Sequence, residues 1–413
     1  MMNPLIMVKA DYRAMRGSAW AVVLLVAFAV AIGVALSAQE KALRTGTTRA
    51  AADFDLVIGA AGSATQLVMT TVYLQPEALP LMPGEILKSL GTDPRVKAFA
   101  PIAFGDVVRG YPVIGTTPDF VTRWGRYDAP MQGRFFSGEN EAVIGHDVAM
   151  QLGEEIIPAH GLGSDNSAKG APSALEASHR HETTRLRVVG RLPATGSPWD
   201  KAILVPIESV WETHGFGNGH RQDGRIGAPF DAETVPPLPA IVVKPHRIAD
   251  AYALRSDHRK NGLMALFPAE ILVSLYRNLG DVRDAMLVAS ILNGVLILGA
   301  VILLIVALFS LRRRRYALLR ALGASALYSG AVAWLGAFGL IAVGCLAGLA
   351  LGWVLTAALS LWLSTQTGLD LHLSPDWTQT LPALLLLLAG SLFAGLPAVM
   401  AYRLSLHEAL RGE

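Results

Sequence analysis

The sequence has few of the residues that mark soluble enzymes and disulfide-bonded domains. Of 413 residues only one, Cys345, is a cysteine, which excludes an intramolecular disulfide and a cysteine-based zinc knuckle. Charged residues make up only 16% and hydrophobic residues 52%, with a mean hydropathy of +0.41, whereas ordinary soluble domains are roughly 25% charged. The net charge of +2 gives no reason to expect a nucleic-acid partner. These deficits indicate a membrane protein.

Catalytic motifs are missing as well. The chain has no G-x-x-x-x-G-K-[ST], so it does not hydrolyse ATP by a P-loop mechanism, and it has neither H-E-x-x-H nor G-x-S-x-G. The stretch Gly59–Gly62 is too short for a dinucleotide fingerprint and predicts a turn. We therefore expect a non-catalytic chain without a cofactor of its own.

Four uncharged stretches are long enough to span a hydrocarbon core of about 30 Å, which needs about 20 helical residues. We expect membrane helices over 17–39, 285–311, 325–364 and 377–402. The third stretch lies in an uncharged block from Ala321 to Leu369, which could hold one helix or two. None of the four contains Asp, Glu, Lys, Arg or His, which favours a lever or an anchor over an ion pathway.

Charge asymmetry favours four helices over five. With four, the basic residues of 1–16, 312–324 and 403–413 share the cytoplasmic side, and the acidic loop 365–376 lies opposite. Both termini are then cytoplasmic. The first span could instead be a cleaved signal peptide, but its apolar run is longer than a signal core and lacks an A-x-A site, so we favour an uncleaved anchor.

A long segment of soluble character, 40–284, separates the first two spans and begins with a predicted helical stalk at 40–52. Strand-like runs are FDLVIG, QLVMTTVYL, VVRGYPVIG, EAVIG, TRLRVVGRL, KAILVPI and AIVVKP, and helical patterns are PGEILKSLGTD and HDVAMQLGEE. Two Gly-, Ser- and Pro-rich stretches around Asp165 and Asn218 predict extended surface loops. The predicted fold is therefore a membrane α-helical protein of four transmembrane helices, with an α+β extracytoplasmic domain inserted between helices 1 and 2.

The most informative stretch is LRRRRYALLRALGAS, residues 311–325, an amphipathic segment directly after the second span. It resembles the cytoplasmic segment R-R-x-E-I-A-L-L-R-A-L-G-A of the MacB/FtsX/LolC-type permeases of ABC transporters. Tyr316 stands where that family often has Ile, and Arg315 where many members have Glu. The ending PAVMAYRLSLHEALR and the layout of one helix, a large domain and three helices also match the family.

The resemblance implies a permease that works by mechanotransmission, as a homodimer or with a similar chain, in the inner membrane of a Gram-negative bacterium. It implies a separate cytoplasmic ATPase, which would hold ATP and magnesium and dock on the segment 312–323 and the termini. Its expected coupling residues are Arg313, Tyr316, Leu318, Leu319, Arg320, Leu322 and Gly323. The cargo stays open among lipid or lipoprotein, peptide, small toxic compound and metal. An alternative is an FtsX-like signalling or scaffold protein that activates a periplasmic partner.

The N-terminal segment places Leu5, Val8, Tyr12 and Met15 on one helical face. Such a helix could lie at the membrane interface and contribute to the docking platform, or simply lead into the first span. Both interpretations fit the pattern equally.

Histidines gather in the segment 40–284, where His179 and His181 form an H-x-H pair. On an extended segment both rings project to one face, and with His160 or His214 they could complete a zinc site. This would make the chain a membrane-tethered metal-binding module. We favour a solvated loop, because a metal site requires convergence in space that spacing alone does not establish.

Overall fold

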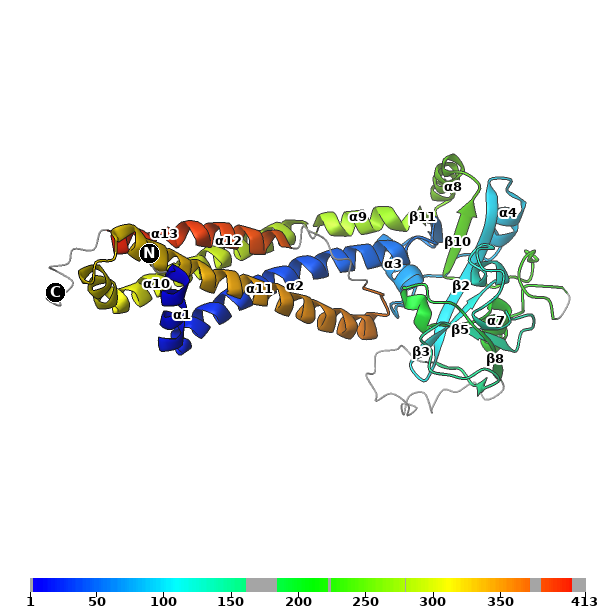
Figure 1. The fold of residues 1–413 in the computed structure, drawn as a ribbon. Coiled ribbons are helices and arrows are strands. Elements are labelled where there is room, and N and C mark those ends of the chain that lie inside the picture. Colours follow the sequence, from blue (N-terminus) through cyan, green and yellow to red (C-terminus); the bar gives the residue numbers. More distant parts are fainter. Residues whose placement is uncertain (1–2, 161–183, 222–223, 279, 372–379, 403–413) are drawn as a thin grey trace. The chain divides into compact units, whose positions relative to one another are not determined.

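A computed structural model describes residues 3–160, 184–221, 224–278, 280–371 and 380–402. The chain divides into two compact units. The helical unit comprises Met1–Leu43, Leu279–Trp362 and His372–Glu413, and the sheet unit comprises Arg44–Asn278 and Leu363–Leu371. Two helices, α2 and α11, therefore belong to both units, each with one end in the sheet unit (Figure 1).

The helical unit is built from long helices. Their bounds are α1 (Pro4–Ala14), α2 (Arg16–Ala50), α10 (Gly280–Ala321), α11 (Ala326–Thr367), α12 (Leu381–Phe393) and α13 (Gly395–Tyr402). The uncharged block thus forms one helix, α11, in agreement with the single-helix interpretation. Within the described residues three stretches are long and apolar enough to cross a membrane: Arg16–Ala50, Ala326–Thr367 and Ala383–Tyr402. The predicted span 285–311 lies in α10 and stays a prediction.

Helices α2 and α11 pack closely because glycines line their contact. Gly344, Gly348 and Gly352 of α11 follow one another at four-residue spacing, so they share one face. A Cβ on Gly348 would stand 2.6 Å from the carbonyl oxygen of Ala27 and 2.7 Å from the Cβ of Val30. Small residues at this spacing let helix backbones approach each other, which is the main source of packing energy between membrane helices.

The sheet unit contains a large mixed sheet. Within the described residues its strands are β1 (Leu56–Gly59), β2 (Val96–Val108), β3 (Tyr111–Thr116), β4 (Gln132–Gly133), β5 (Glu141–Ile144), β6 (Glu155–Ile156), β7 (Ala159–His160), β8 (Leu186–Arg191), β9 (Ile203–Pro206), β10 (Ala240–Pro245) and β11 (Met264–Leu266). The order is β11-β1-β10-β2-β3-β9-β5-β8-β4, with β6 on β8 and β7 on β2. The β3–β9 and β5–β8 pairs are parallel and the others antiparallel.

Helices are interspersed among the strands along this unit, which confirms a mixed α/β domain. Its helices are α3 (Ala64–Tyr73), α4 (Ile86–Thr92), α5 (Pro118–Val121), η1 (Pro198–Lys201), α7 (Ile207–Thr213), α8 (Ile248–Lys260) and α9 (Pro268–Asn278). The core consists mainly of Val, Ile and Leu side chains from the central strands, among them Ile58, Ile144 and Ile241, all buried.

Two of the local predictions are wrong. The run QLVMTTVYL forms helix α3, not a strand. The prediction failed because the run is buried on nearly every side, and periodicity cannot separate a buried helix from a buried strand. Its start is capped by Ser63 Oγ, which accepts from the backbone N–H of Gln66 at 3.3 Å. The run HDVAMQLGEE forms no helix, because its backbone bonds elsewhere: the N–H of Asp147 donates to Asp200 and that of Gly153 to Val188.

The glycine-rich stretch around Asn218 forms a loop, as its composition predicts, and exposes residues such as Phe216, but the loop is buried in part. Asn218 and His220 are both buried, and His220 Nε2 lies 3.1 Å from Glu208 Oε1. The His220 ring stacks on Phe230 at 5.2 Å. This side-chain pair holds the stretch against α7. The other predicted loop, around Asp165, lies outside the described residues.

Candidate coupling site at the α10–α11 turn

The segment expected to couple to an ATPase forms the end of α10 and the turn into α11. The N–H of Ala324 donates to the carbonyl of Leu319 and the N–H of Gly323 to that of Arg320, each at 3.0 Å, which is a Schellman ending. Gly323 has φ of +94°, a left-handed conformation that glycine adopts without strain. Ser325 Oγ then accepts from the N–H of Tyr328 and caps α11. Hydrogen bonds therefore fix the backbone of the turn both where α10 ends and where α11 begins.

The inner face of this segment is packed, not presented to a partner. Tyr316 and Ala317 are 4% and 0% exposed, in a cluster with Val8 of α1 and Ala401 of α13. The Tyr316 ring stacks on Phe309 at 5.2 Å. Burial, with Asp11 as a lesser cause, raises the pKa of Tyr316, so the ring stays neutral. Tyr316 thus ties the segment to the helices around it.

Its outer face exposes leucines. Leu318 and Leu322 are 53% and 86% exposed, and Leu327, in the first turn of α11, is 75% exposed. We call these three residues the hairpin tip. Leu319, in contrast, is half-buried against the cluster around Tyr316. The structure therefore separates the predicted coupling leucines into two that can contact a partner and one that holds the segment in place.

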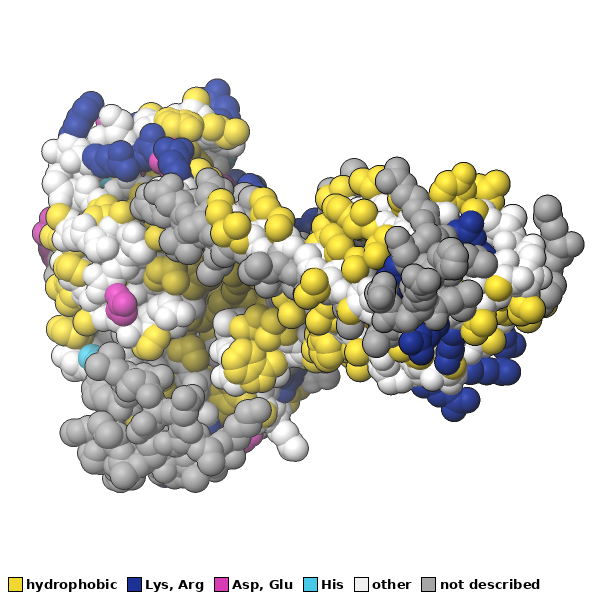
Figure 2. Space-filling view, turned by 90° about the vertical axis from the view of Figure 1, so that its left-hand side faces the viewer, with side chains coloured by type: hydrophobic (Ala, Val, Ile, Leu, Met, Phe, Trp, Pro, Cys, Tyr) yellow, Lys and Arg dark blue, Asp and Glu magenta, His cyan; other side chains and the backbone are white. Residues whose placement is uncertain are grey.

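The arginines of the segment bind neighbouring elements. Arg312 and Arg315 place guanidinium nitrogens 3.5 and 3.6 Å from the two carboxylate oxygens of Asp11 in α1. Arg320 donates to the carbonyl of Tyr402, the last residue of α13, at 3.4 Å. Arg313 is half-buried. Figure 2 shows Lys and Arg side chains beside hydrophobic ones over the helical unit.

Asp11 is a residue that the sequence analysis missed. Asp11 brings a carboxylate from a different helix to within 3.6 Å of the Arg315 guanidinium. The signal in the sequence was the lone acidic residue among the basic residues of the N-terminal segment. Helix α1 is further fixed by Tyr12, whose hydroxyl donates to the carbonyl of Gly336 at 2.6 Å.

The predicted face of α1 is packed in part. Val8 is buried, and Tyr12 and Met15 are half-buried against the other helices, but Leu5 is 57% exposed. Three of the four residues thus hold α1 to the bundle. This supports the prediction that α1 belongs to the docking platform, by which we mean the packed ends of α1, α10, α11 and α13 from which the hairpin tip projects.

The predicted zinc ligands are only partly described. His179 and His181 lie outside the described residues. The backbone of His160 pairs with Asp106 of β2, and His214 Nε2 lies 3.7 Å from Asp106 Oδ1 while its Nδ1 donates to the carbonyl of Val210. Among the described residues, no three His, Cys, Asp or Glu side chains come together as metal ligands. The zinc site stays a prediction.

Two family models match the chain in succession. The model described as the MacB-like periplasmic core domain matches residues 19–256, more than half of the sequence. That of the FtsX-like permease C-terminal matches residues 287–406, which contain the α10–α11 turn and the hairpin tip. The chain belongs to the MacB/FtsX-type permeases of ABC transporters.

Other comparisons add little to the assignment of this MacB/FtsX-type permease. It is similar to the extracellular domain of the noncanonical ABC-type transporter YknZ from Gram-positive bacteria, at 13% identity over 52% of this chain and 98% of that one. The TM-score is 0.28. No curated protein matches the chain.

Members of this family are membrane-embedded permease subunits with a periplasmic domain, and they are generally not catalytic. A cytoplasmic ATPase partner, and often a second permease chain, follow from the family. The residues that contact them in this chain do not follow from membership.

Proposed function

We propose that this permease acts by mechanotransmission: a separate cytoplasmic ATPase docks on the hairpin tip, and its ATP- and magnesium-dependent cycle moves the membrane helices and the periplasmic sheet unit. In this scheme four helices cross the inner membrane, the sheet unit is inserted between the first and second, and both termini are cytoplasmic. The permease works as a homodimer or with a similar chain. Its cargo is handled outside the membrane.

The observation that carries the proposal is the contrast between the two faces of the α10–α11 segment. Leu318, Leu322 and Leu327 are exposed, while Tyr316 and Ala317 on the other face are buried against three elements of the helical unit. Fully burying one leucine in a partner's groove stabilises a complex by about 1.5–3 kcal/mol. A push on the tip would then be passed to α1, α11 and α13, because Tyr316 and Ala317 are buried against residues of these helices.

The arginines support the same assignment. A basic cluster at the end of a membrane helix anchors it on the cytoplasmic side, at about 1 kcal/mol per charge near anionic lipid. Here Arg312 and Arg315 also bind Asp11, and Arg320 binds the end of α13. These bonds fix the shape of the platform, which lipid anchoring alone does not require.

The test is affinity purification of the tagged chain from native membranes, followed by identification of its partners and an ATPase assay. We expect a stoichiometric P-loop ATPase with the wild type and its loss with Leu318→Asp/Leu322→Asp. The structure favours this pair over a change at Leu319, whose removal would disturb packing. The matched control is Leu81→Asp/Leu152→Asp, two exposed leucines of the sheet unit.

An ATPase retained by the hairpin-tip variant would show that the docking assignment is wrong. An extracytoplasmic protein purified in place of an ATPase would favour the FtsX-like signalling or scaffold role. Cargo movement in reconstituted vesicles separates that role from transport.

A further inference from the structure

Within the sheet unit, the loop 195–201 holds the end of helix α11. The Lys201 ammonium donates to the carbonyl of Thr365 and lies 3.5 Å from that of Ser364. Just beyond the helix, the N–H of Asp370 donates to the carbonyl of Gly196 at 3.1 Å. A lysine that binds carbonyls in the last turn of a helix complements the negative end of the helix dipole. Lys201 therefore caps α11 from another part of the chain.

The loop that presents Lys201 is held together by hydrogen bonds to a buried carboxylate. The carboxylate of Asp200, 4% exposed, accepts from the backbone N–H groups of Thr195 and Gly196 at 2.7–3.0 Å and from the Thr195 hydroxyl at 2.7 Å. Bonds to a buried carboxylate are among the stronger ones in proteins. Lys201 is thus attached to a fixed support.

Trp199 anchors this loop in the unit's interior. It is 1% exposed, and its indole N–H donates to the carbonyl of Val72 in α3 at 3.1 Å. Its ring packs against Phe54 and Phe120, with centroids 5.8 and 4.9 Å apart. The Arg123 guanidinium lies over the same aromatic group, 4.5 Å from the Phe120 centroid.

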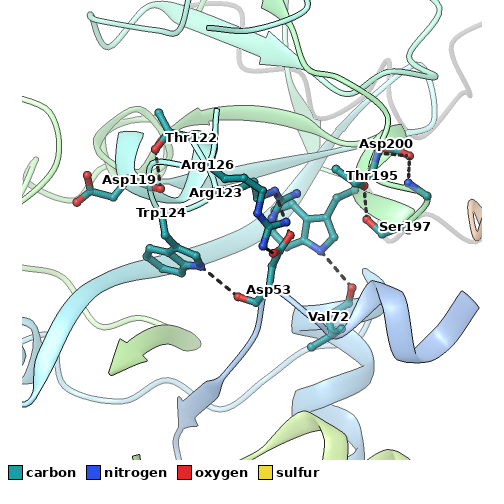
Figure 3. A network of polar contacts seen from close by, with 12 residues as sticks. Asp53, Val72, Asp119, Thr122, Arg123, Trp124, Arg126, Thr195, Ser197 and Asp200 are labelled. Carbon is teal, nitrogen blue, oxygen red and sulfur yellow. Dashed lines mark hydrogen bonds and ion pairs between the residues drawn. The ribbon is translucent and has the colours of Figure 1, made fainter. Parts of the chain in front are cut away.

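The end of helix α2 reaches the same cluster (Figure 3). Asp53, three residues beyond α2, has a carboxylate oxygen 2.6 Å from Arg126 and the other 3.9 Å from the buried Arg123. Its carbonyl accepts from the indole N–H of Trp124 at 3.2 Å. Arg123 and Trp124 both have positive φ, 51° and 61°, a conformation that non-glycine residues keep only when their surroundings enforce it.

The two helix ends also contact each other in this unit. Arg49 of α2 lies 3.9 Å from the carboxylate of Asp370, and a Cβ on Gly46 would stand 3.3 Å from the Leu371 side chain. Asp53, Arg123, Trp199, Asp200 and Lys201, which we call the helix joint, therefore hold both ends to one buried cluster.

We propose that the helix joint fixes the ends of α2 and α11 to the sheet, so that movement of these helices is passed to the sheet unit. Lys201 acts as a positioning residue for this movement. The inference rests on the proposed function for the movement itself, but the attachment of α11 can be tested without it.

The first measurement is hydrogen–deuterium exchange on the full-length chain in lipid nanodiscs, without nucleotide. With Lys201→Met, we expect the Asp370 amide to exchange about tenfold faster, since a charge-assisted bond that holds its neighbourhood is lost. Lys201→Arg should restore slow exchange. The matched control is Lys244→Met, which removes an ammonium paired with Asp55 at 2.7 Å elsewhere in the unit. Unchanged exchange in Lys201→Met, or equal acceleration in Lys244→Met, would overturn the joint.

The second measurement compares exchange with and without ATP in the permease purified with its ATPase. We expect Lys201→Met to keep the ATP-dependent change at the α10–α11 turn but to lose the change in the strands, while Lys244→Met keeps both. Retention of both changes in Lys201→Met would overturn the joint. A wild type with no ATP-dependent change in the strands would instead contradict mechanotransmission, and the first measurement would still decide the joint.

Discussion

The tight contact between α2 and α11 makes a specific prediction for Gly348→Ala. The added methyl group would stand 2.6 Å from the Ala27 carbonyl oxygen and 3.0 Å from its Cα, well inside the 3.4 Å at which ordinary contact begins. Both are backbone atoms, so no rotamer change relieves the overlap and the helices must move apart. Overpacking of this kind costs about 1–3 kcal/mol, and the better helix propensity of alanine offsets up to about 1 kcal/mol of it.

The assay uses the protein's only cysteine. Cys345 is 4% exposed and belongs to the apolar cluster between α2 and α11, so a thiol-reactive fluorophore labels it when this contact opens. For a unit of this size, a net loss of about 1–2 kcal/mol lowers the midpoint of thermal labelling by about 2–8 °C. The control is Gly336→Ala in the same helix, where an added Cβ meets no atom within 4 Å. Equal midpoints for Gly348→Ala and Gly336→Ala would refute the argument.

Two further predictions concern the other parts of the chain. The hydrogen bonds from Arg134 lower the pKa of Glu141 from 4.5 to about 2. The ionised carboxylate therefore stabilises the folded state. This contribution is complete above pH 4.5 and is lost as the pH falls toward 2. Because Arg134 is exposed and water screens the pair, we expect a small difference in stability between wild type and Glu141→Gln that is present above pH 4.5 and gone near pH 2; a constant difference would contradict it. Gly323→Ala forces alanine into a left-handed conformation at a cost of about 1–2 kcal/mol, so the Ala324 amide should exchange about tenfold faster, whereas Gly336→Ala should leave it unchanged.

Some features follow from local sequence alone. The absence of charge between Ala321 and Leu369 predicts α11, and the short apolar, β-branched run AIVVKP predicts β10, because each signal comes from the segment itself. The glycine stripe is as local as these. Gly344, Gly348 and Gly352 stand at four-residue spacing in the sequence, so the close helix contact could have been predicted and was missed.

The contacts of the helix joint, in contrast, could not be predicted from local sequence. Lys201 and Thr365 are separated by 164 positions, and nothing in either segment indicates the other. Their contact depends on where the sheet places the loop and on where α11 ends. The same holds for Asp11, whose partners Arg312 and Arg315 lie at the far end of another helix. Long-range pairs of this type are set by tertiary packing and not by periodicity.

The pairing of β1 with β11 has a consequence for how this permease could have evolved. Val57 lies opposite Leu266 in this antiparallel pair, so the chain enters and leaves the sheet on neighbouring strands. A domain with adjacent ends can be exchanged as a cassette, because its replacement leaves the spacing of the host segments unchanged. A replacement domain would function only if it also supplied a partner for the Asp53 carboxylate and a cap for the end of α11. Recombination among related permeases could thus replace the sheet unit, and with it what is recognised outside the membrane. The helical unit that faces the ATPase would stay unchanged.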